Sequence, residues 1–184
     1  MSESKIVRVL YGLRVRVGPL LVVGVFLAAR STVRSLLIGL VIAAAGLSIR
    51  AWAAGHIQKE KKLAVSGPYR HTRNPLYLGN FALGIGIAVA TNSLWGAGLF
   101  LLYFGMFYPP VIIEERARMK RLFPAEYADY TKRVPLFFPH LRPSPGDGIG
   151  RFRWALYRKN REPRALLGTI FVWALLIAKM LLFR

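Results

Sequence analysis

Apolar residues are gathered into five blocks, with polar residues in the stretches between them. An α-helix of about 20 residues crosses the hydrocarbon core of a membrane. The second and fourth blocks reach that length, while the first has only 13 residues between Arg16 and Arg30. The pattern therefore predicts an all-α, integral membrane helical bundle with about five transmembrane helices, forming a single membrane domain over residues 1–184. The five blocks are residues 17–29, 35–55, 76–92, 94–113 and 166–183.

The short first block leaves several interpretations open. It forms a tilted or half-inserted helix, or the Arg side chains at its ends lengthen it by reaching to the membrane surface. A cleavable signal peptide is the rival interpretation. No convincing small-residue cleavage site follows the block, and a second apolar block begins at once. We therefore favour a membrane helix.

The composition agrees with a membrane protein. The chain of 184 residues is 54% hydrophobic with a mean hydropathy of +0.38, yet its formal net charge is +19. Membrane proteins combine these properties by placing apolar residues in spans and cations in loops. The absence of cysteine excludes disulfides and thiolate chemistry. His56, His71 and His140 lack the spacing of metal ligands, so no metal site is predicted.

The cations indicate how the chain crosses the membrane. If the N-terminus is cytoplasmic and all five blocks span, 22 of the 27 Lys and Arg residues face the cytoplasm and three face outward. Cytoplasmic loops of membrane proteins carry an excess of Lys and Arg. We therefore expect a cytoplasmic N-terminus, and with it a cytoplasmic location for the loops 56–75 and 114–165.

Two polar stretches are more elaborate than a simple turn requires. The first, residues 61–79 (KKLAVSGPYRHTRNPLYLG), and the second, residues 114–139, flank the third and fourth blocks. The link between those blocks, Thr91, Asn92 and Ser93, is very short and uncharged, so the two helices should form a tight hairpin. A tight hairpin brings the two stretches together at the cytoplasmic surface, where we expect a ligand pocket.

Residues 61–79 have the chemistry of a ligand loop. Pro68 and Pro75 restrict the backbone, and Pro75 suits the first turn of the following helix. The start of that helix would offer backbone N–H groups to an anionic group such as a carboxylate. Tyr69 and Tyr77 could stack on an adenine or contact a sulfonium. The alternative is a basic loop whose tyrosines only mark the membrane interface.

Charged residues near the blocks have two interpretations each. Glu114 and Glu115 could accept hydrogen bonds from ribose hydroxyls or offset a sulfonium charge, or they could pair with Arg118 on the same helix. Arg50 lies inside the second block, where an ionisable residue is a functional candidate. It is five residues from the end of the block, so we expect its side chain to reach the surface. Lys179 is nearer its end and is expected to be structural.

The C-terminal third is predicted to be basic and interfacial. A break at Pro124 should divide the helix that begins at Glu114. Residues 133–139 should be extended, with Phe137 and Phe138 at the lipid boundary. Residues 142–165 combine a flexible linker, 142–150, with an interfacial amphipathic helix over 151–164, and the last transmembrane helix occupies 166–183. Aromatic residues among these cations favour anionic membrane lipids over nucleic acid as a partner.

At these residues the sequence resembles the superfamily of isoprenylcysteine carboxyl methyltransferases and phospholipid methyltransferases. That family has a G-x-Y…RHP-x-Y-x-G loop, a helical hairpin, an EE pair and a tail of the form FG-x-x-Y-x-x-Y-x-x-x-VP-x-x-P. The matching stretches lie within residues 55–141. They are SGPYRHTRNPLYLG (66–79), EE (114–115) and LFPAEYADYTKRVPLFFP (122–139).

The resemblance implies a methyltransferase that takes S-adenosylmethionine from the cytosol and a lipophilic acceptor from the bilayer. Arg73 and Glu114 are candidates for a catalytic role. Two other functions stay open, a membrane reductase using NADPH and a non-catalytic protein that binds anionic lipids. By motif, the cofactor pocket would involve Lys61, Lys62, Leu63, Ala64, Tyr69, Asn74, Pro75, Leu76, Tyr77 and Glu115.

The chain departs from the family pattern at four positions. Asn74 stands for the His of RHP, Lys61 for a His before the loop, and Pro124 for the Gly of the tail. Val111 stands where the carboxyl methyltransferases have an Arg thought to orient the substrate carboxylate. The last departure argues against a carboxylate as the methyl acceptor. An amine or a hydroxyl stays possible.

Overall fold

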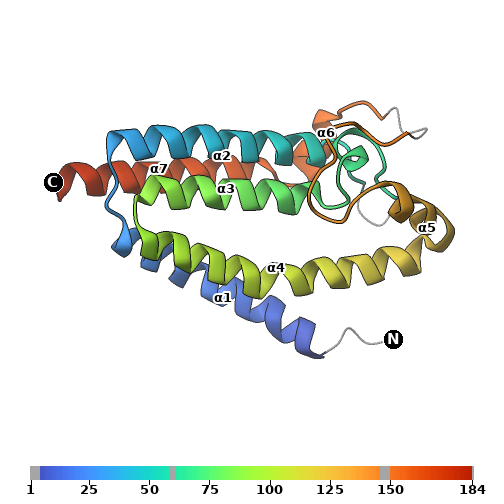
Figure 1. Cartoon of the computed structure of the whole chain (residues 1–184), viewed down its shortest axis with the longest axis horizontal. Coiled ribbons are helices and arrows are strands. Elements are labelled where there is room, and N and C mark those ends of the chain that lie inside the picture. The colour runs from blue at the N-terminus through green and yellow to red at the C-terminus, as the bar shows by residue number, and fades with distance from the viewer. Residues whose placement is uncertain (1–4, 59–60, 146–149, 184) are drawn as a thin grey trace. The chain divides into compact units, whose positions relative to one another are not determined.

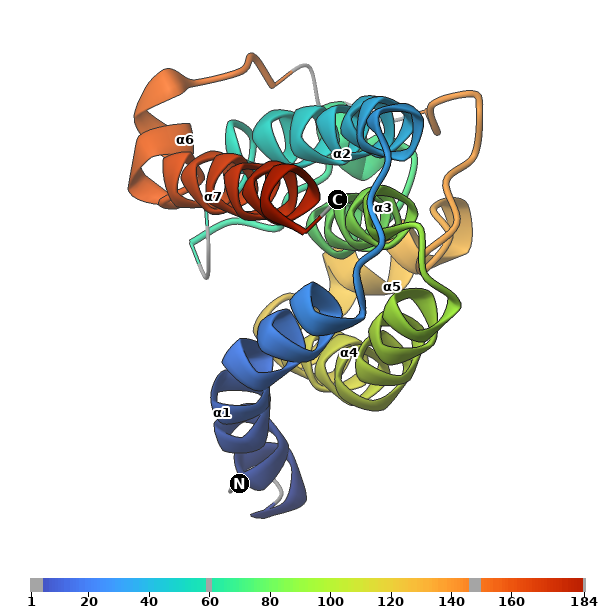
Figure 2. The ribbon, with the colours of Figure 1, turned by 90° about the vertical axis from the view of Figure 1, so that its left-hand side faces the viewer.

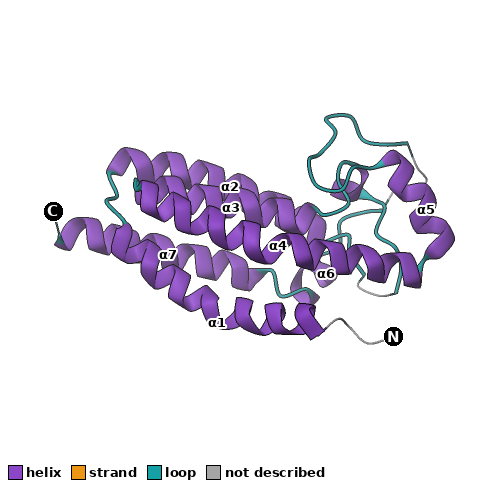
Figure 3. Cartoon of the chain, turned by 60° about the horizontal axis from the view of Figure 1, so that its bottom comes forward, coloured by secondary structure: helices purple, strands orange, loops and turns teal. Residues whose placement is uncertain are grey.

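The computed structural model describes residues 5–58, 61–145 and 150–183, and throughout these ranges the secondary structure is helical, with no strand (Figures 1 and 3). The all-α prediction is therefore confirmed. A short 3₁₀-helix, η1 (Gly67–Arg70), lies between α2 and α3. The α-helices are α1 (Lys5–Ala28), α2 (Val33–Ala54), α3 (Pro75–Thr91), α4 (Leu94–Leu122), α5 (Pro124–Arg133), α6 (Trp154–Lys159) and α7 (Pro163–Leu182).

Three of the described helices, α2, α4 and α7, are long and apolar enough to cross a membrane. The other two predicted spans form shorter apolar helices, with 17 residues in α3 and an apolar stretch Arg16–Ala28 within the 24 residues of α1. Pro124 begins α5 directly after α4 ends, as predicted for a proline that breaks a helix.

The chain forms two compact units. The first consists of residues 1–43, 83–115 and 169–184, and the second of residues 44–82 and 116–168. The boundaries between them fall inside α2, α3, α4 and α7.

Small residues bring α2 and α3 together in the first unit. A Cβ atom added at Gly39 would lie 2.8 Å from the backbone nitrogen of Ala90, and one added at Gly86 would lie 2.7 Å from the carbonyl oxygen of Gly39. Side chains larger than hydrogen would therefore separate the helices, as expected where small residues allow membrane helices to approach. Ala43 and Ala90, which are fully buried, continue this contact. Figure 2 shows α2 and α3 side by side.

Polar side chains in the first unit bind backbone carbonyl groups. The hydroxyls of Ser31 and Ser35 both donate to the carbonyl oxygen of Ala90, at 2.7 and 3.1 Å. Lys179 Nζ donates to the carbonyl oxygens of Phe26 and Leu27 at the end of α1, at 2.6 and 2.8 Å. A cation is favoured there because the C-terminal end of a helix carries a partial negative charge. Lys179 is therefore structural, as predicted.

In the second unit, α2 and α3 also approach closely. A Cβ atom added at Gly79 would lie 2.6 Å from Arg50 Cγ and 2.8 Å from the carbonyl oxygen of Gly46. Gly79 is the last residue of the 61–79 loop, so the glycine of that sequence motif has a packing role. It lets the Arg50 side chain pass between α2 and α3.

Candidate functional site

The loop 61–79 folds as its sequence predicts. Gly67 has φ +58°, in the left-handed region that favours glycine, and a Cβ atom there would lie 2.7 Å from His56 Nε2. Pro68 lies in the first turn of η1, and Pro75 is the first residue of α3. The two prolines thus lie at the starts of the two helical segments of this stretch, η1 and α3.

The loop packs against α5 through a small hydrophobic core. Leu63 is buried with Tyr127, Tyr130 and Val134, and Met119 packs against the cluster from the last part of α4. The prediction that the 61–79 loop neighbours the second polar stretch is confirmed for residues 119–134. Tyr127, Tyr130 and Val134 of the tail motif therefore hold the loop at Leu63.

Tyr130 also bonds the loop directly. Its hydroxyl donates to the carbonyl oxygen of Tyr69 at 2.7 Å. Burial raises the pKa of Tyr130 well above its ordinary value of 10.0, since the phenolate would lose its hydration. The hydroxyl therefore stays protonated and donates over the physiological range of pH.

The tail after α5 runs along the loop and pairs with it. Asn74 Nδ2 donates to the carbonyl oxygen of Leu136 at 2.8 Å, and the Thr72 hydroxyl donates to that of Phe137 at the same distance. The backbone N–H of Arg73 donates to the Pro135 carbonyl at 2.9 Å. The amide nitrogen of Asn74 thus ties the loop to the tail, and its predicted contact with a cofactor stays a prediction.

The tail differs in part from the interfacial segment that we predicted. Phe138 is exposed, as expected for a residue at the lipid boundary. Phe137 is half-buried, and its ring lies 6.0 Å from that of Phe81 in an edge-to-face contact. Its backbone is fixed to the loop by the hydrogen bonds described above, because buried peptide groups need partners.

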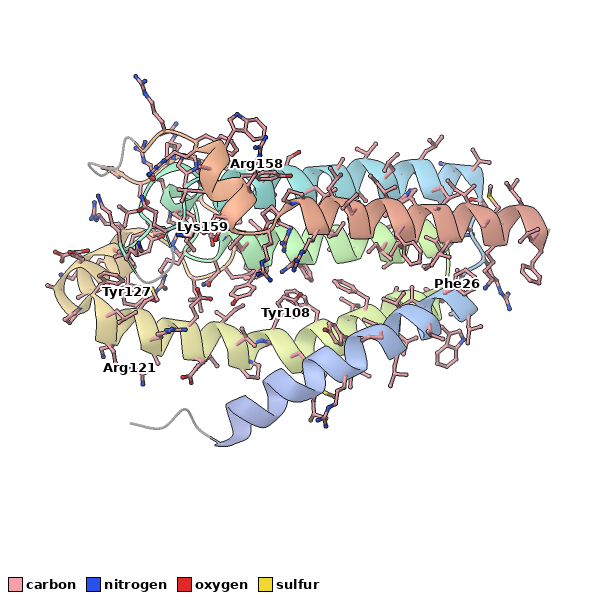
Figure 4. All side chains as sticks on the ribbon, turned by 180° about the vertical axis from the view of Figure 1, so that it is seen from behind. Phe26, Tyr108, Arg121, Tyr127, Arg158 and Lys159 are labelled. Carbon is pink, nitrogen blue, oxygen red and sulfur yellow. The ribbon has the colours of Figure 1, made fainter. Side chains whose placement is uncertain are left out.

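Arg73 is the loop residue best placed to bind a ligand. Its guanidinium carbon lies 6.0 Å from the ring centroid of Tyr127 (labelled in Figure 4), and Nη1 donates a long hydrogen bond of 3.4 Å to the Tyr127 hydroxyl. Its Nε–H is buried and has no hydrogen-bond partner within the described residues. A buried donor without a partner costs free energy, and an anionic ligand would satisfy it.

Three residues assigned to the cofactor by resemblance, Lys62, Leu63 and Ala64, line one cleft of about 230 Å³. Gly150, Arg151 and Arg153 line it from the other side. Lys61 is exposed beside them, while Pro75, Leu76 and Tyr77 form the first turn of α3. The structure therefore brings together the early part of the predicted set in a cleft, and the later part at a helix N-terminus.

The prediction that the Arg50 side chain reaches the surface is wrong, because the structure holds it in an ion pair with Glu162. Its Nε and Nη2 atoms donate to the Glu162 carboxylate at distances of 2.8–3.1 Å, and Nη1 donates to Asn80 Oδ1. Both side chains of the pair are largely buried. Glu162 is separated from Arg50 by 112 residues, and no motif marked it in the sequence.

Glu114, Glu115 and Val111 belong to the first unit, toward the end of α4. Glu114 and Glu115 are half-buried, and their part in a cofactor pocket stays a prediction. Val111 is only 2% exposed, so the position at which the carboxyl methyltransferases have an Arg is buried in this chain.

The predicted interfacial helix over 151–164 is much shorter in the structure. Only the six residues Trp154–Lys159 form α6, and Arg161 takes a positive φ of 58° before α7 begins at Pro163. The helix ends at Asn160 because its side chain donates to the carbonyl oxygens of Ala54 and Ile57 at the end of α2. Of the predicted linker, residues 146–149 lie outside the described residues.

The fold and the loop define an integral membrane protein that carries a methyltransferase motif on an all-helical chain. The family model for phospholipid methyltransferase matches residues 21–126, which is more than half of the chain. The protein belongs to this family. The match includes the whole 61–79 loop, Glu114 and Glu115. It ends within α5, before residues 127–139 of the tail motif and before α6 and α7.

Two curated relatives carry names that refer to metals. The nickel-cobalt-cadmium resistance protein NccN of Alcaligenes xylosoxydans xylosoxydans is 38% identical over 107 residues, covering 57% of this chain and 48% of that protein. The cobalt-zinc-cadmium resistance protein CzcN of Cupriavidus metallidurans is 34% identical over 113 residues, covering 60% and 52%. The chain thus spans about half the length of these relatives. No solved structure matches it.

Proposed function

We propose that the protein transfers a methyl group from S-adenosylmethionine to a lipophilic acceptor at the cytoplasmic face of a membrane. The observation that carries the proposal is the 61–79 loop, which lies inside the family match and is held rigidly by α5 and the tail. A loop that only linked two helices would need none of these contacts.

The residues of the loop fit the cofactor. The buried Nε–H of Arg73 lacks an acceptor within the described part of the chain, and it lies two residues before the N-terminus of α3. A guanidinium and a helix N-terminus both favour an anion, and the carboxylate of S-adenosylmethionine is one. By resemblance to the family motif, Tyr77 and Glu115 would also take part in cofactor binding.

When bound, the cofactor supplies a methyl group that its sulfonium has already activated. The chain's task is therefore to align the two reactants and to exclude water. Arg73 and the first turn of α3 would hold the donor end. The bonds from Tyr130, Thr72 and Asn74 fix the loop backbone, so little ordering remains to be done when a ligand binds.

The acceptor is expected to be an amine or a hydroxyl. A carboxylate acceptor would need a cation to orient it, and Val111 provides none. The names of NccN and CzcN refer to metal resistance, and within the described residues no three His, Cys, Asp or Glu side chains gather as metal ligands do. Methyl transfer therefore remains the function that the loop supports best.

Calorimetric titration of the detergent-purified chain with S-adenosylhomocysteine tests this proposal. Saturable binding with one site per chain is the expected result, and NADPH should not compete. No heat at millimolar ligand would refute the methyltransferase assignment. Displacement by NADPH would favour a membrane reductase, and binding of anionic lipid alone would favour a non-catalytic protein.

A further inference from the structure

A short basic segment outside the family match forms one wall of the cleft beside the loop. We call residues 150–159 the basic strap. The backbone N–H of Arg153 donates to the Gly55 carbonyl at 3.0 Å, and a ring nitrogen of His56 lies 3.1 Å from the Gly150 carbonyl oxygen. These contacts seat the strap on the end of α2.

Two glycines allow the strap to lie this close. A Cβ atom at Gly150 would lie 2.9 Å from Ser66 Cβ, and one at Gly55 would lie 3.0 Å from Phe152 Cγ, with other atoms of both side chains nearer still. Beyond the strap, Asn160 and the Arg50–Glu162 pair bind the chain to α2 again. The strap is therefore anchored at both of its ends.

The seated strap leaves a cleft with a cationic lining. Lys62, Arg151 and Arg153 all line it and are exposed, and the side chains of His56 and Ser66 add polar groups. None of the described lining residues is Asp or Glu. With a volume of about 230 Å³, the cleft is large enough for a small anionic group. Its charge favours such a group over a neutral or cationic one.

Exposed aromatic rings adjoin the cations. Trp154 is 68% exposed and Phe152 is 36% exposed, and their rings meet edge to face at 5.0 Å. Tyr157 completes the cluster, with its ring 5.6 Å from that of Trp154. Trp and Tyr are enriched where one part of a side chain meets lipid and another meets water. Aromatic residues beside a cationic cleft are thus the chemistry that recognises a lipid headgroup.

We propose that the cleft between the basic strap and residues 62–66 binds the phosphate of an anionic lipid headgroup. Arg151, Arg153 and Lys62 would donate to the phosphate, and Phe152 and Trp154 would lie among the upper parts of the lipid chains. The cleft includes Lys62, Leu63 and Ala64, which the resemblance assigns to the cofactor, but Arg73 and the first turn of α3 do not line it. Lipid binding in the cleft can therefore be tested apart from the proposed methyl transfer.

Native mass spectrometry of the full chain, purified in a neutral detergent and mixed with equal amounts of phosphatidylglycerol and phosphatidylcholine, tests the site. Wild type should retain phosphatidylglycerol preferentially. Arg151→Gln/Arg153→Gln should lower that preference at least about tenfold, because it removes two of the three cations that favour a net anionic headgroup over a zwitterionic one. Arg151→Lys/Arg153→Lys should restore most of it.

Arg158→Gln/Lys159→Gln is the matched control, because it removes two exposed cations from α6 that do not line the cleft (Figure 4). It should lower the preference less than about twofold. Equal losses in the two double variants would show a diffuse attraction, to which each cation near the surface contributes alike, and would overturn the site. So would unchanged retention in both.

Two further arms separate the possible ligands. If millimolar inorganic phosphate binds while phosphatidylglycerol is not preferred, the site takes a soluble anion and the lipid assignment is wrong. Titration of the same variants with S-adenosylhomocysteine should show unchanged affinity. If Arg151→Gln/Arg153→Gln loses that affinity and keeps its lipid preference, the cleft holds the cofactor instead. Lipid preference without any S-adenosylhomocysteine binding would leave this site standing and refute only the methyl transfer.

Discussion

Arg73 is the single residue whose substitution tests the proposed cofactor site most directly. Lysine keeps the positive charge but lacks the Nε–H and the planar fork that bind a carboxylate through two bonds. We expect Arg73→Lys to weaken S-adenosylhomocysteine binding about tenfold, since a hydrogen bond between charged groups contributes about 1.5–3 kcal/mol. Calorimetric titration measures the change.

The matched control for Arg73→Lys is Arg142→Lys, at an exposed residue of the same unit. It should bind the ligand as wild type does. Wild-type affinity in Arg73→Lys itself would move the ligand away from the α3 N-terminus. A fall in the thermal midpoint of Arg73→Lys would instead show that the residue serves the fold through Tyr127.

Tyr130 should contribute to stability and not to ligand contact. Tyr130→Phe leaves the buried Tyr69 carbonyl without its donor, which should cost about 1–2 kcal/mol of unfolding free energy. Thermal unfolding in detergent measures this cost, and Tyr157→Phe, whose ring is half-buried, is the comparison. A loss of equal size in the two variants would mean that the hydrogen bond from Tyr130 to Tyr69 contributes no more than the hydroxyl of a half-buried tyrosine does.

The raised pKa of Tyr130 also predicts how the stability difference between wild type and Tyr130→Phe depends on pH. Because burial raises the pKa in the folded state above 10.0, the unfolded chain releases this proton first as the pH rises. The contribution of Tyr130 is therefore complete below pH 10.0 and declines above it. The stability gap between wild type and Tyr130→Phe should narrow above that pH, and a gap that stays constant would contradict the burial of the hydroxyl.

Some residues of the site could be predicted from the sequence and others could not. Pro68, Pro75 and Gly67 act through the backbone next to them, so the local sequence suffices. Arg50 was misjudged because its position in a span suggests a path to the surface, while its partner Glu162 lies 112 residues away. Nothing local distinguishes Glu162 from the other acidic residues.

The contact between α2 and α3 in the second unit should tolerate no side chain at Gly79. In Gly79→Ala the new methyl group would meet the Gly46 carbonyl oxygen, a backbone atom that cannot move aside alone. We expect a loss of about 1–3 kcal/mol, typical of an overpacked interior. Gly105→Ala is the control, since nothing lies within 4 Å of a Cβ atom there.

For Gly105→Ala, helix propensity alone should give unchanged or slightly higher stability. Thermal unfolding of the two variants side by side measures the difference. Equal midpoints would mean that α2 and α3 are less closely packed at Gly79 than the structure shows.

The Arg50–Glu162 pair joins α2 to the start of α7, and its two charges should be strongly coupled. Removing either one leaves the other buried without its partner, which should cost about 3 kcal/mol or more. Arg50→Gln/Glu162→Gln should lose less than the sum of the single variants, because no charge is then left alone. A double-mutant cycle by unfolding in denaturant measures the coupling, and additive losses would show that the two side chains act independently.

Helices were predicted with unequal success, for a physical reason. The long apolar helices α2, α4 and α7 could be predicted because some 20 residues in each contribute to the same apolar pattern. The region 151–164 has helical spacing as well, yet only Trp154–Lys159 is helical. There Asn160 bonds the end of α2 and Pro163 starts a new helix. A contact with a distant element thus overrides a weak local preference.

At the scale of the whole molecule, the family match and the compact units divide the chain differently. The match ends at residue 126, but the second unit continues to residue 168. Tyr130, the tail and Glu162, which hold the loop and α2, all lie beyond the match. The loop of this chain is therefore supported by residues that the family model does not describe, and a fragment ending at residue 126 should not keep the loop ordered.

The distribution of charge predicts the orientation in the membrane, and the chain is well suited to a test of this prediction. Because the sequence has no cysteine, single introduced cysteines report on one site each. With 22 cations placed on the cytoplasmic side and three outside, Ser93→Cys between α3 and α4 should face outward, and Arg142→Cys after α5 should face inward.

In intact cells, a membrane-impermeant maleimide should label only Ser93→Cys. Permeabilisation should expose Arg142→Cys, while labelling of both sites before it would mean that α4 does not cross the membrane. The reverse pattern would place the 61–79 loop outside, away from cytosolic S-adenosylmethionine, and the proposed methyl transfer would then fail on topology alone.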